Sequence, residues 1–413
     1  FCEGENQVSL TQVRVEDNEA ERGGGLAASY DCELSILGSL ILNNQAQTHG
    51  GGIYTYSTAV MVEDSAFLSN SANEYAGAIY LHLSDGTLDG INVSENTSPG
   101  GAGLITNNST VAISGSTFED NDATTSSGAM NFYYSTAMVE DSTIVNNEAG
   151  NKGGAVLASF STLFFSDTTF SGNQVDDTGG AMYLRDTDAT FDSVILSENT
   201  GTTGAALYLT ETSTLIDSGS TFQSNVAEDG GGAIYAEDSA LSLVSTEFTS
   251  NEAVSGGAIW AYTADTVTID GVTFSDNTSS YSGGALSVHF STDVSVTNSI
   301  FDTNESTRGG AIDLTSFAGA SVTDSSFVAN DGLWGGAIYL ESDSTLTLSD
   351  SVISDNIGSI HGGGLYLVES ECMVSDTSFS GNTDEEDTWV DDVETAYTWG
   401  ENASFACTQE GCE

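Results

Sequence analysis

Short segments in which apolar and polar residues alternate recur along most of the chain, and glycine, serine and asparagine separate them. The segment Thr-Leu-Thr-Leu at residues 345–348 is one example. Its period of two and its β-branched residues are typical of a β-strand. We find no convincing window with the i, i+3, i+4, i+7 spacing of an amphipathic helix. The pattern therefore predicts an all-β protein.

An asparagine returns at an almost constant interval. Of the fourteen intervals, twelve are 26 residues, one is 25 and one is 27. A unit of this size cannot bury a core alone, so each unit is expected to stack on its neighbours. The asparagines are Asn18, Asn44, Asn70, Asn96, Asn121, Asn147, Asn173, Asn199, Asn225, Asn251, Asn277, Asn304, Asn330, Asn356 and Asn382.

The consensus of the repeats is S-x-F-x-x-N, followed by a short polar loop and then G-G-A-I-Y-L, with another apolar residue in place of phenylalanine in some units. Residues 256–259, Gly-Gly-Ala-Ile, are a clear copy of the second motif. Short strands at this spacing predict a β-solenoid of parallel strands, in which equivalent positions lie about 4.8 Å apart in columns. We expect the asparagines to form a hydrogen-bonded ladder and to tolerate the left-handed backbone of corners. The glycines are expected at bends with positive φ.

The pairing of G-G-A-I with F-x-x-N resembles the repeat of chlamydial polymorphic outer membrane proteins and related bacterial β-helix proteins. The resemblance covers roughly residues 8–382. It implies a single right-handed parallel β-helix of about 15 turns and a role as a surface adhesin. The repeat domain is then residues 1–382, and the aromatic and acidic segment 383–413 is expected to act as a C-terminal capping or docking segment.

The charge of the chain restricts its partners. Asp and Glu number 61 against 5 Lys and Arg, and the formal net charge is −56. Nucleic acid would be repelled by such a chain. No run of 18 apolar residues is present, so we expect no membrane-spanning helix. The chain begins without a charged and apolar leader, consistent with a mature product that is secreted or displayed on the cell surface.

Aspartates recur six residues before the repeated asparagine. Carboxylates stacked about 5 Å apart repel unless a cation lies between them, and Ca²⁺ prefers oxygen ligands. A calcium column is therefore one interpretation, and an acidic surface suited to salty or cation-rich water is the other. The residues are Asp64, Asp141, Asp167, Asp324, Asp350 and Asp376, of which the last three belong to consecutive turns.

The cysteines lie near the two ends of the chain. We expect Cys2 to pair with Cys32 and staple the entry segment, and Cys372 to pair with Cys407 and staple the tail. Cys412 is then free or intermolecular. A local pair of Cys407 with Cys412 is the alternative.

The residue after the isoleucine of G-G-A-I is expected to point outward, because its two neighbours are apolar and alternate inward. It is mostly aromatic, which predicts an exposed column. Three roles fit this column: stacking that stabilises the sheet, self-association or partner binding, and glycan binding. The aromatic members are Tyr54, Tyr80, Tyr183, Tyr208, Tyr235, Trp260, Tyr339 and Tyr366, interrupted by Asn131, Leu157, Ser287 and Asp313.

No catalytic motif stands out. The four histidines fall in different turns, and adjacent acids are expected by chance in so acidic a chain. The regular spacing also leaves no long insertion from which a cleft is built. We therefore expect a structural protein that forms or decorates an extracellular fibre or surface layer. The alternatives are a surface adhesin or glycan-binding module and, further off, a polysaccharide lyase or hydrolase.

Overall fold

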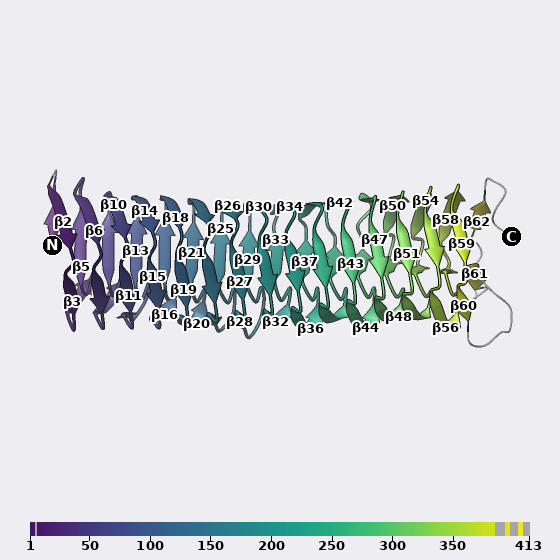
Figure 1. Ribbon diagram of the computed structural model, residues 1–413, viewed down its shortest axis with the longest axis horizontal. Coiled ribbons are helices and arrows are strands. Elements are labelled where there is room, and N and C mark those ends of the chain that lie inside the picture. The colour runs from purple at the N-terminus through teal and green to yellow at the C-terminus, as the bar shows by residue number, and fades with distance from the viewer. Residues whose placement is uncertain (5, 385–392, 397–403, 408–413) are drawn as a thin grey trace. The chain divides into compact units, whose positions relative to one another are not determined.

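The computed structural model describes residues 1–4, 6–384, 393–396 and 404–407, the last two segments by their backbone alone. The chain divides into two compact units, Phe1–Thr202 (unit 1) and Thr203–Glu413 (unit 2). All the regular secondary structure described is β-strand, and each unit is built from four parallel sheets (Figure 1). One strand from each sheet makes one turn of the chain.

The first sheet, called the GGAI sheet, contains the strands that begin at the aliphatic residue of G-G-A-I. In unit 1 these are β1 (Cys2–Glu3), β5 (Leu26–Ser29), β9 (Ile53–Tyr56), β13 (Ile79–His82), β17 (Leu104–Asn107), β21 (Met130–Tyr133), β25 (Val156–Ser159) and β29 (Met182–Arg185). In unit 2 they are β33 (Leu207–Thr210), β37 (Ile234–Glu237), β41 (Ile259–Tyr262), β45 (Leu286–His289), β49 (Ile312–Thr315), β53 (Ile338–Glu341), β57 (Leu365–Val368) and β61 (Val393–Ala396).

The second sheet, called the alternating sheet, contains the segments with the clearest period of two. In unit 1 these are β2 (Gln7–Thr11), β6 (Glu33–Leu37), β10 (Ala59–Glu63), β14 (Asp85–Asp89), β18 (Thr110–Ser114), β22 (Thr136–Glu140), β26 (Thr162–Ser166) and β30 (Asp188–Asp192). In unit 2 they are β34 (Thr214–Ser218), β38 (Ala240–Val244), β42 (Thr266–Asp270), β46 (Val294–Thr297), β50 (Gly319–Thr323), β54 (Thr345–Ser349), β58 (Glu371–Ser375) and β62 (Ser404–Cys407).

The third sheet, called the phenylalanine sheet, contains the residue three positions before each repeated asparagine. In unit 1 its strands are β3 (Arg14–Glu16), β7 (Leu40–Leu42), β11 (Ala66–Leu68), β15 (Asn92–Ser94), β19 (Thr117–Glu119), β23 (Thr143–Val145), β27 (Thr169–Ser171) and β31 (Ile195–Ser197). In unit 2 they are β35 (Thr221–Gln223), β39 (Glu247–Thr249), β43 (Thr273–Ser275), β47 (Ile300–Asp302), β51 (Ser326–Val328), β55 (Val352–Ser354) and β59 (Ser378–Ser380).

The fourth sheet, called the loop sheet, lies between the asparagine and the glycines. In unit 1 its strands are β4 (Glu19–Arg22), β8 (Gln45–His49), β12 (Ser71–Ala72), β16 (Thr97–Gly100), β20 (Asp122–Ser126), β24 (Glu148–Ala149), β28 (Gln174–Val175) and β32 (Thr200–Thr203), which reaches the unit boundary. In unit 2 they are β36 (Val226–Gly230), β40 (Glu252–Ser255), β44 (Thr278–Ser282), β48 (Glu305–Arg308), β52 (Asp331–Trp334), β56 (Ile357–His361) and β60 (Thr383–Asp384).

The core is made of columns of like residues. Parallel register places each residue opposite its equivalent in the next turn, as with Phe274 and Phe301. In unit 2, Phe222, Phe248, Phe274, Phe301 and Phe327 are fully buried and stack with ring centroids 4.6 to 5.0 Å apart. The interior is therefore held by dispersion and apolar burial along the column.

The asparagines form the predicted hydrogen-bonded ladder. Along the ladder, an Asn Oδ1 accepts from the backbone N–H and the Nδ2 of the asparagine one turn earlier. Asn121 donates in this way to Asn147, at 3.1 Å from the backbone nitrogen and 2.9 Å from Nδ2. Asn147 Nδ2 in turn donates to Asn173 Oδ1 and to the carbonyl of Phe118, each at 3.0 Å. This pattern runs from Asn18 to Asn199 in unit 1, and in unit 2 it includes Asn225, Asn251, Asn277, Asn304, Asn330, Asn356 and Asn382.

The left-handed corner residue is not the ladder asparagine, so that detail of the prediction is wrong. The residue just before it has positive φ instead, for example Asn146 at 53°. The expected positive φ of the glycine corners is confirmed at Gly256, with φ 61°. A Cβ on Gly256 would lie 2.3 Å from the carbonyl oxygen of Ile259, so a larger residue does not fit.

The disulfide prediction is correct at one end and wrong at the other. Cys2 and Cys32 form a disulfide. Cys372 is a free, buried thiol, and the register places Phe405 rather than Cys407 opposite it. Burial raises the pKa of the Cys372 thiol to about 12, so the thiol stays protonated at neutral pH. Cys412 and the side chain of Cys407 lie outside the described residues.

The predicted capping segment, 383–413, lies mostly outside the described residues. Its described parts extend three of the sheets of unit 2: β60 pairs with β56, β61 with β57 and β62 with β58. The proposed boundary at residue 382 stays a prediction. Four parallel sheets, turns of about 26 residues and inward columns together define a parallel β-helix in each unit.

Candidate ligand-binding sites

The aromatic column on the outer face of the GGAI sheet is largely covered, so the expectation of an exposed column is wrong. Tyr54, Tyr208 and Trp260 are half-buried. The buried members are Tyr80, Tyr183, Tyr235, Tyr339 and Tyr366, which are 5 to 9% exposed. Adjacent rings contact one another: Tyr208 stacks on Tyr235 at 5.0 Å between centroids. These contacts support the interpretation that stacking stabilises the sheet.

The rings are also covered by side chains from the end of the loop sheet, just before the glycines. Lys152 Nζ lies 4.3 Å from the ring centroid of Tyr183. His361 stacks on Tyr366 with centroids 5.4 Å apart. The contact between these side chains and the aromatic column was not predicted, although basic or aromatic residues recur in the sequence just before the glycines.

A cleft in unit 1 opens onto the first part of this column. It has a volume of about 640 Å³, and its walls include Arg22, His49, Tyr54, Tyr56 and His82. Tyr54 stacks on Tyr80 at 5.6 Å between ring centroids, and Tyr56 lies 5.2 Å from His82. Two of the four histidines of the chain, His49 and His82, thus line the same cleft as Arg22 and several tyrosines.

Unit 2 contains a buried ionic cluster where the aromatic column is interrupted. Asp313 occupies the column position on β49 and is fully buried. Arg308, at the end of β48, donates to Asp313 Oδ2 at 3.2 Å and to Glu341 Oε2 at 2.8 Å. Its guanidinium carbon lies 4.5 Å from the ring centroid of Tyr281 and 5.1 Å from that of Tyr339. Arg308 therefore contacts two carboxylates and two aromatic rings at this break in the aromatic column.

The cluster perturbs its titratable groups. Burial raises the pKa of Asp313 to about 7 despite the opposing charge of Arg308. Burial lowers the pKa of His289, on the neighbouring strand β45, to about 4. The Ser287 hydroxyl pairs with Ser282 at 3.1 Å and His289 Nε2 with Thr315 at 3.2 Å. The described hydrogen bonds thus do not join Ser287 and His289 as nucleophile and base.

Replacing Arg308 with methionine is expected to destabilise unit 2 by about 3 kcal/mol at pH 8, because Asp313 loses its buried partner. Since the folded pKa of Asp313 is raised, its contribution to stability is full below pH about 4 and is lost as the pH rises through about 7. At pH 5 the Asp313 carboxyl is protonated, so the Arg308→Met variant should lose much less free energy of unfolding than at pH 8. Urea unfolding at both pH values measures this difference.

Arg14→Met is the matched control, because Arg14 pairs with Glu16 on the exposed surface of unit 1. This variant should have the same free energy of unfolding as the unmodified protein at either pH. If Arg308→Met lowers the free energy of unfolding equally at pH 5 and pH 8, ionised Asp313 is not the group that Arg308 stabilises.

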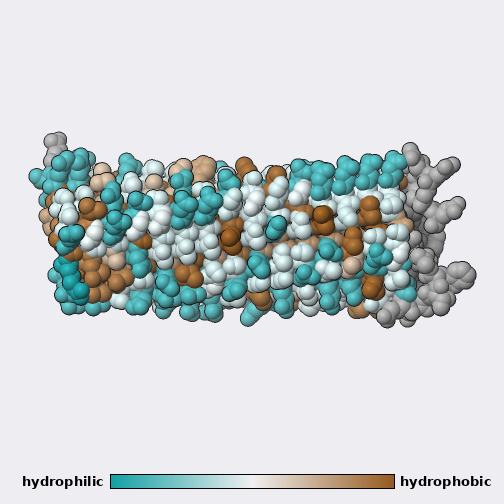
Figure 2. Space-filling model, in the orientation of Figure 1, coloured by the Kyte–Doolittle hydropathy of each residue, from teal (hydrophilic) through white to brown (hydrophobic). Residues whose placement is uncertain are grey.

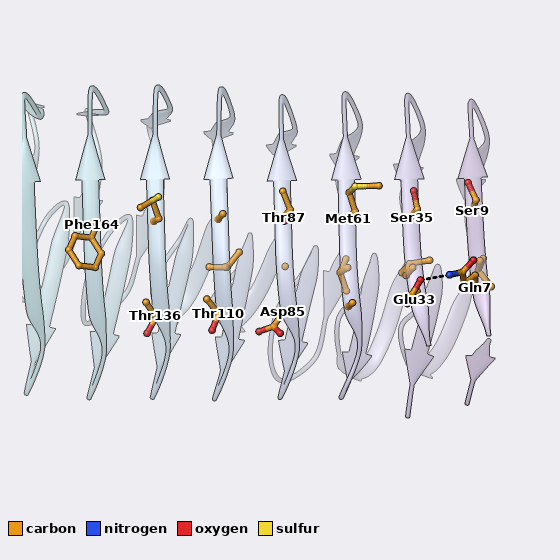
Figure 3. Close-up of a pocket in the computed structure, with 18 residues that line it drawn as sticks. Gln7, Ser9, Glu33, Ser35, Met61, Asp85, Thr87, Thr110, Thr136 and Phe164 are labelled. Atoms are coloured by element: carbon orange, nitrogen blue, oxygen red, sulfur yellow. Dashed lines mark hydrogen bonds between the residues drawn. The ribbon is translucent and has the colours of Figure 1, made fainter. Parts of the chain in front are cut away.

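A groove lies over the alternating sheet of unit 1. It has a volume of about 880 Å³ and crosses the strands from β2 to β26. Figure 3 shows its outward side chains as rows across successive strands: Gln7, Glu33, Asp85, Thr110 and Thr136 on one side, and Ser9, Ser35, Met61 and Thr87 on the other. Apolar side chains, 42 to 46% exposed, project along it: Met61, Met138 and Phe164.

The small residues of the second row make the groove. Ser9, Ser35, Thr87 and Ala112 are short and at least partly exposed, so the sheet surface between the larger side chains is recessed. On the face seen in Figure 2, apolar residues occur in small groups among polar ones. The groove therefore combines an apolar side with hydroxyl and carboxylate groups within one unit.

The aspartate column has a local explanation in the backbone. Asp141, Asp167, Asp324, Asp350 and Asp376 are exposed and have φ between 47° and 51°. Aspartate and asparagine tolerate this left-handed region better than most residues. Among the described residues no group of three or more His, Cys, Asp or Glu side chains is placed to hold a metal ion. Calcium binding by this column stays a prediction.

The comparisons with known proteins identify the family. The family model described as the right handed beta helix region matches residues 1–192 and 205–384. The chain belongs to this family of right-handed parallel β-helices, and the predicted fold class and handedness are confirmed. Neither the search of curated proteins nor that of solved structures found a match. In the described part of the chain, no helix is long and apolar enough to cross a membrane.

Proposed function

We propose that this protein is an extracellular β-helix adhesin that binds a long, uncharged glycan in the groove of the alternating sheet of unit 1. The observation that carries the proposal is the groove itself, which extends across seven adjacent strands of one sheet. A ligand lying across these strands would meet an equivalent position about every 4.8 Å. An elongated ligand with a repeating structure suits this arrangement better than a compact one.

The chemistry of the groove supports a sugar chain. Met61, Met138 and Phe164 offer apolar surface to the C–H faces of sugar rings, and a ring such as that of Phe164 stacks on them. The hydroxyls of Thr110 and Thr136, both exposed, are positioned beside them to hydrogen-bond with sugar hydroxyls. Few precisely placed polar groups in a mainly apolar site are typical of ligand recognition.

Charge favours a neutral ligand over the other occupants. Glu33 and Asp85 line the groove, and the whole chain carries a formal net charge of −56. At the groove, these carboxylates repel a second copy of the chain, an anionic membrane or an acidic polymer. A neutral glycan experiences no such repulsion.

An extracellular location is supported by the disulfide between Cys2 and Cys32, because such bonds persist in oxidising compartments. The finer resemblance to chlamydial polymorphic outer membrane proteins, through the G-G-A-I and F-x-x-N motifs, points to the same adhesive role. The alternative is the structural, fibre-forming protein considered from the sequence. A polysaccharide lyase or hydrolase is the third possibility, and chain cleavage during the binding assay would reveal it.

A panel of neutral oligosaccharides of increasing length tests the proposal. The intact protein should bind at least one series, and its affinity should rise with chain length. Ala112→Glu places a charge in the groove without disturbing the core and should weaken binding about tenfold or more. Ser321→Glu is the matched control, because Ser321 is an exposed residue on the same face of β50 in unit 2.

Three results would count against the adhesin. Absence of binding to every neutral glycan contradicts it, as does equal weakening by Ser321→Glu. Light scattering of the free protein decides the alternative, since growth into filaments without ligand would favour a fibre.

A further inference from the structure

The cleft of about 640 Å³ beside the start of the aromatic column in unit 1 has a chemistry of its own. No residue that lines it lines the groove of the alternating sheet. An inference about this cleft therefore stands apart from the proposed adhesin activity.

Parallel register creates the cleft by aligning functional groups that are far apart in the chain. Arg22 at the end of β4 is the register partner of His49 at the end of β8. On the GGAI sheet, Tyr54 and Tyr56 of β9 are the partners of Tyr80 and His82 of β13. The cleft thus has a basic column from the loop sheet next to an aromatic column from the GGAI sheet.

The Arg22 side chain brings a positive charge to the cleft at neutral pH. It is exposed, its guanidinium carbon lies 5.5 Å from the ring centroid of Tyr54, and it forms no ion pair within the described residues. Burial lowers the pKa of both His49 and His82. The two imidazoles are therefore mainly neutral at pH 7. An accessible guanidinium without a carboxylate partner is unusual in a chain with 61 Asp and Glu residues.

The two histidines both line the cleft. The Nδ1 atoms of His49 and His82 are both buried, and neither has a hydrogen-bond partner among the described residues. His49 also packs edge-on against Tyr80, with ring centroids 4.9 Å apart, which holds its plane. Protein atoms cover each Nδ1, so the two half-buried rings line the cleft through their other atoms.

We propose that this cleft binds a carboxylate carried on a sugar ring, such as a uronic acid. The Arg22 guanidinium receives the carboxylate through charge-assisted hydrogen bonds. The rings of Tyr54 and Tyr56, both half-buried, pack against the apolar face of the sugar. His49 and His82 interact with its hydroxyls.

Three probes separate the parts of this ligand. Sodium glucuronate carries both the ring and the charge, glucose carries the ring alone, and acetate carries the charge alone. Each is titrated into the intact protein while the imidazole proton signals are followed by NMR. The chain has four histidines, so His→Gln variants assign the signals, and His289 and His361 in unit 2 serve as internal references.

Glucuronate should shift the His49 and His82 signals and leave those of His289 and His361 unchanged. It should bind about tenfold more tightly than glucose or acetate. Arg22→Gln should abolish this preference for glucuronate. Tyr56→Ser should weaken the binding of glucuronate and should not strengthen the binding of acetate. Arg14→Gln is the control, since Arg14 is an exposed arginine of the same unit outside the cleft.

The proposal is overturned if glucuronate shifts none of the histidine signals, if glucose or acetate binds equally well, or if Arg22→Gln and Arg14→Gln behave alike. Arg22 is exposed, so its replacement should leave the fold intact, as circular dichroism checks. Should Arg22→Gln unfold unit 1, the comparison of the three probes on the unmodified protein still decides the question.

Discussion

Asn147→Ala is expected to lower the free energy of unfolding of unit 1 by about 4 kcal/mol. The side chain is fully buried, and its Oδ1 accepts from both the backbone N–H and the Nδ2 of Asn121. Its Nδ2 donates to the carbonyls of Phe118 and Val145. Alanine leaves several of these buried groups without a partner, and each unsatisfied group costs about 1–3 kcal/mol. Denaturant unfolding followed by circular dichroism measures the loss.

Asn151→Ala is the control for this ladder variant. Asn151 lies in the same turn, and its side chain is exposed. Its replacement should change the free energy of unfolding by less than about 0.5 kcal/mol. If both variants are equally stable, the ladder does not contribute as the hydrogen bonds indicate.

Phe301→Ala is expected to lower the free energy of unfolding of unit 2 by about 4 kcal/mol. The ring is fully buried, with centroids 4.8 Å from Phe274 and 4.6 Å from Phe327, so its removal leaves a cavity between two turns. Phe301→Leu keeps most of the volume and should cost about 1 to 2 kcal/mol. The same unfolding measurement compares the two variants.

Phe317→Ala provides the reference for an exposed ring, because Phe317 lies in the same unit and is 60% exposed. Its effect should be within about 0.5 kcal/mol of zero. A loss from Phe301→Ala no larger than that of Phe317→Ala would mean that the stack relaxes around the cavity.

The fold was predictable because its main signals are local and repeated. A period of two specifies which side chains share a face, and a repeat of 26 residues places equivalent residues in one column. The burial of the phenylalanines and the contacts between the asparagines follow from these two periods. The positive φ of the residue before each asparagine did not follow, because asparagine is itself a favoured left-handed residue and only the backbone shows which position turns.

The candidate sites were less predictable because exposure depends on neighbours from other turns and other sheets. Outward tyrosines such as Tyr339 looked exposed, yet Arg308 from the loop sheet covers that ring. The groove arose from small outward residues on adjacent turns, among them Ser35 and Ala112, which belong to no motif. The pattern within one strand does not show which side chains of the neighbouring sheet pack against it at the corner between the two sheets.

The amino-acid sequence by itself determined the all-β class, the turn length, the asparagine ladder and the apolar columns, since each depends on spacing along the chain. The tertiary structure alone decided that the tyrosines are covered, that Cys372 is a free thiol and that Arg22 lies beside His49. These features depend on side chains from different sheets and turns meeting at a corner. Only the coiled backbone brings them within contact distance.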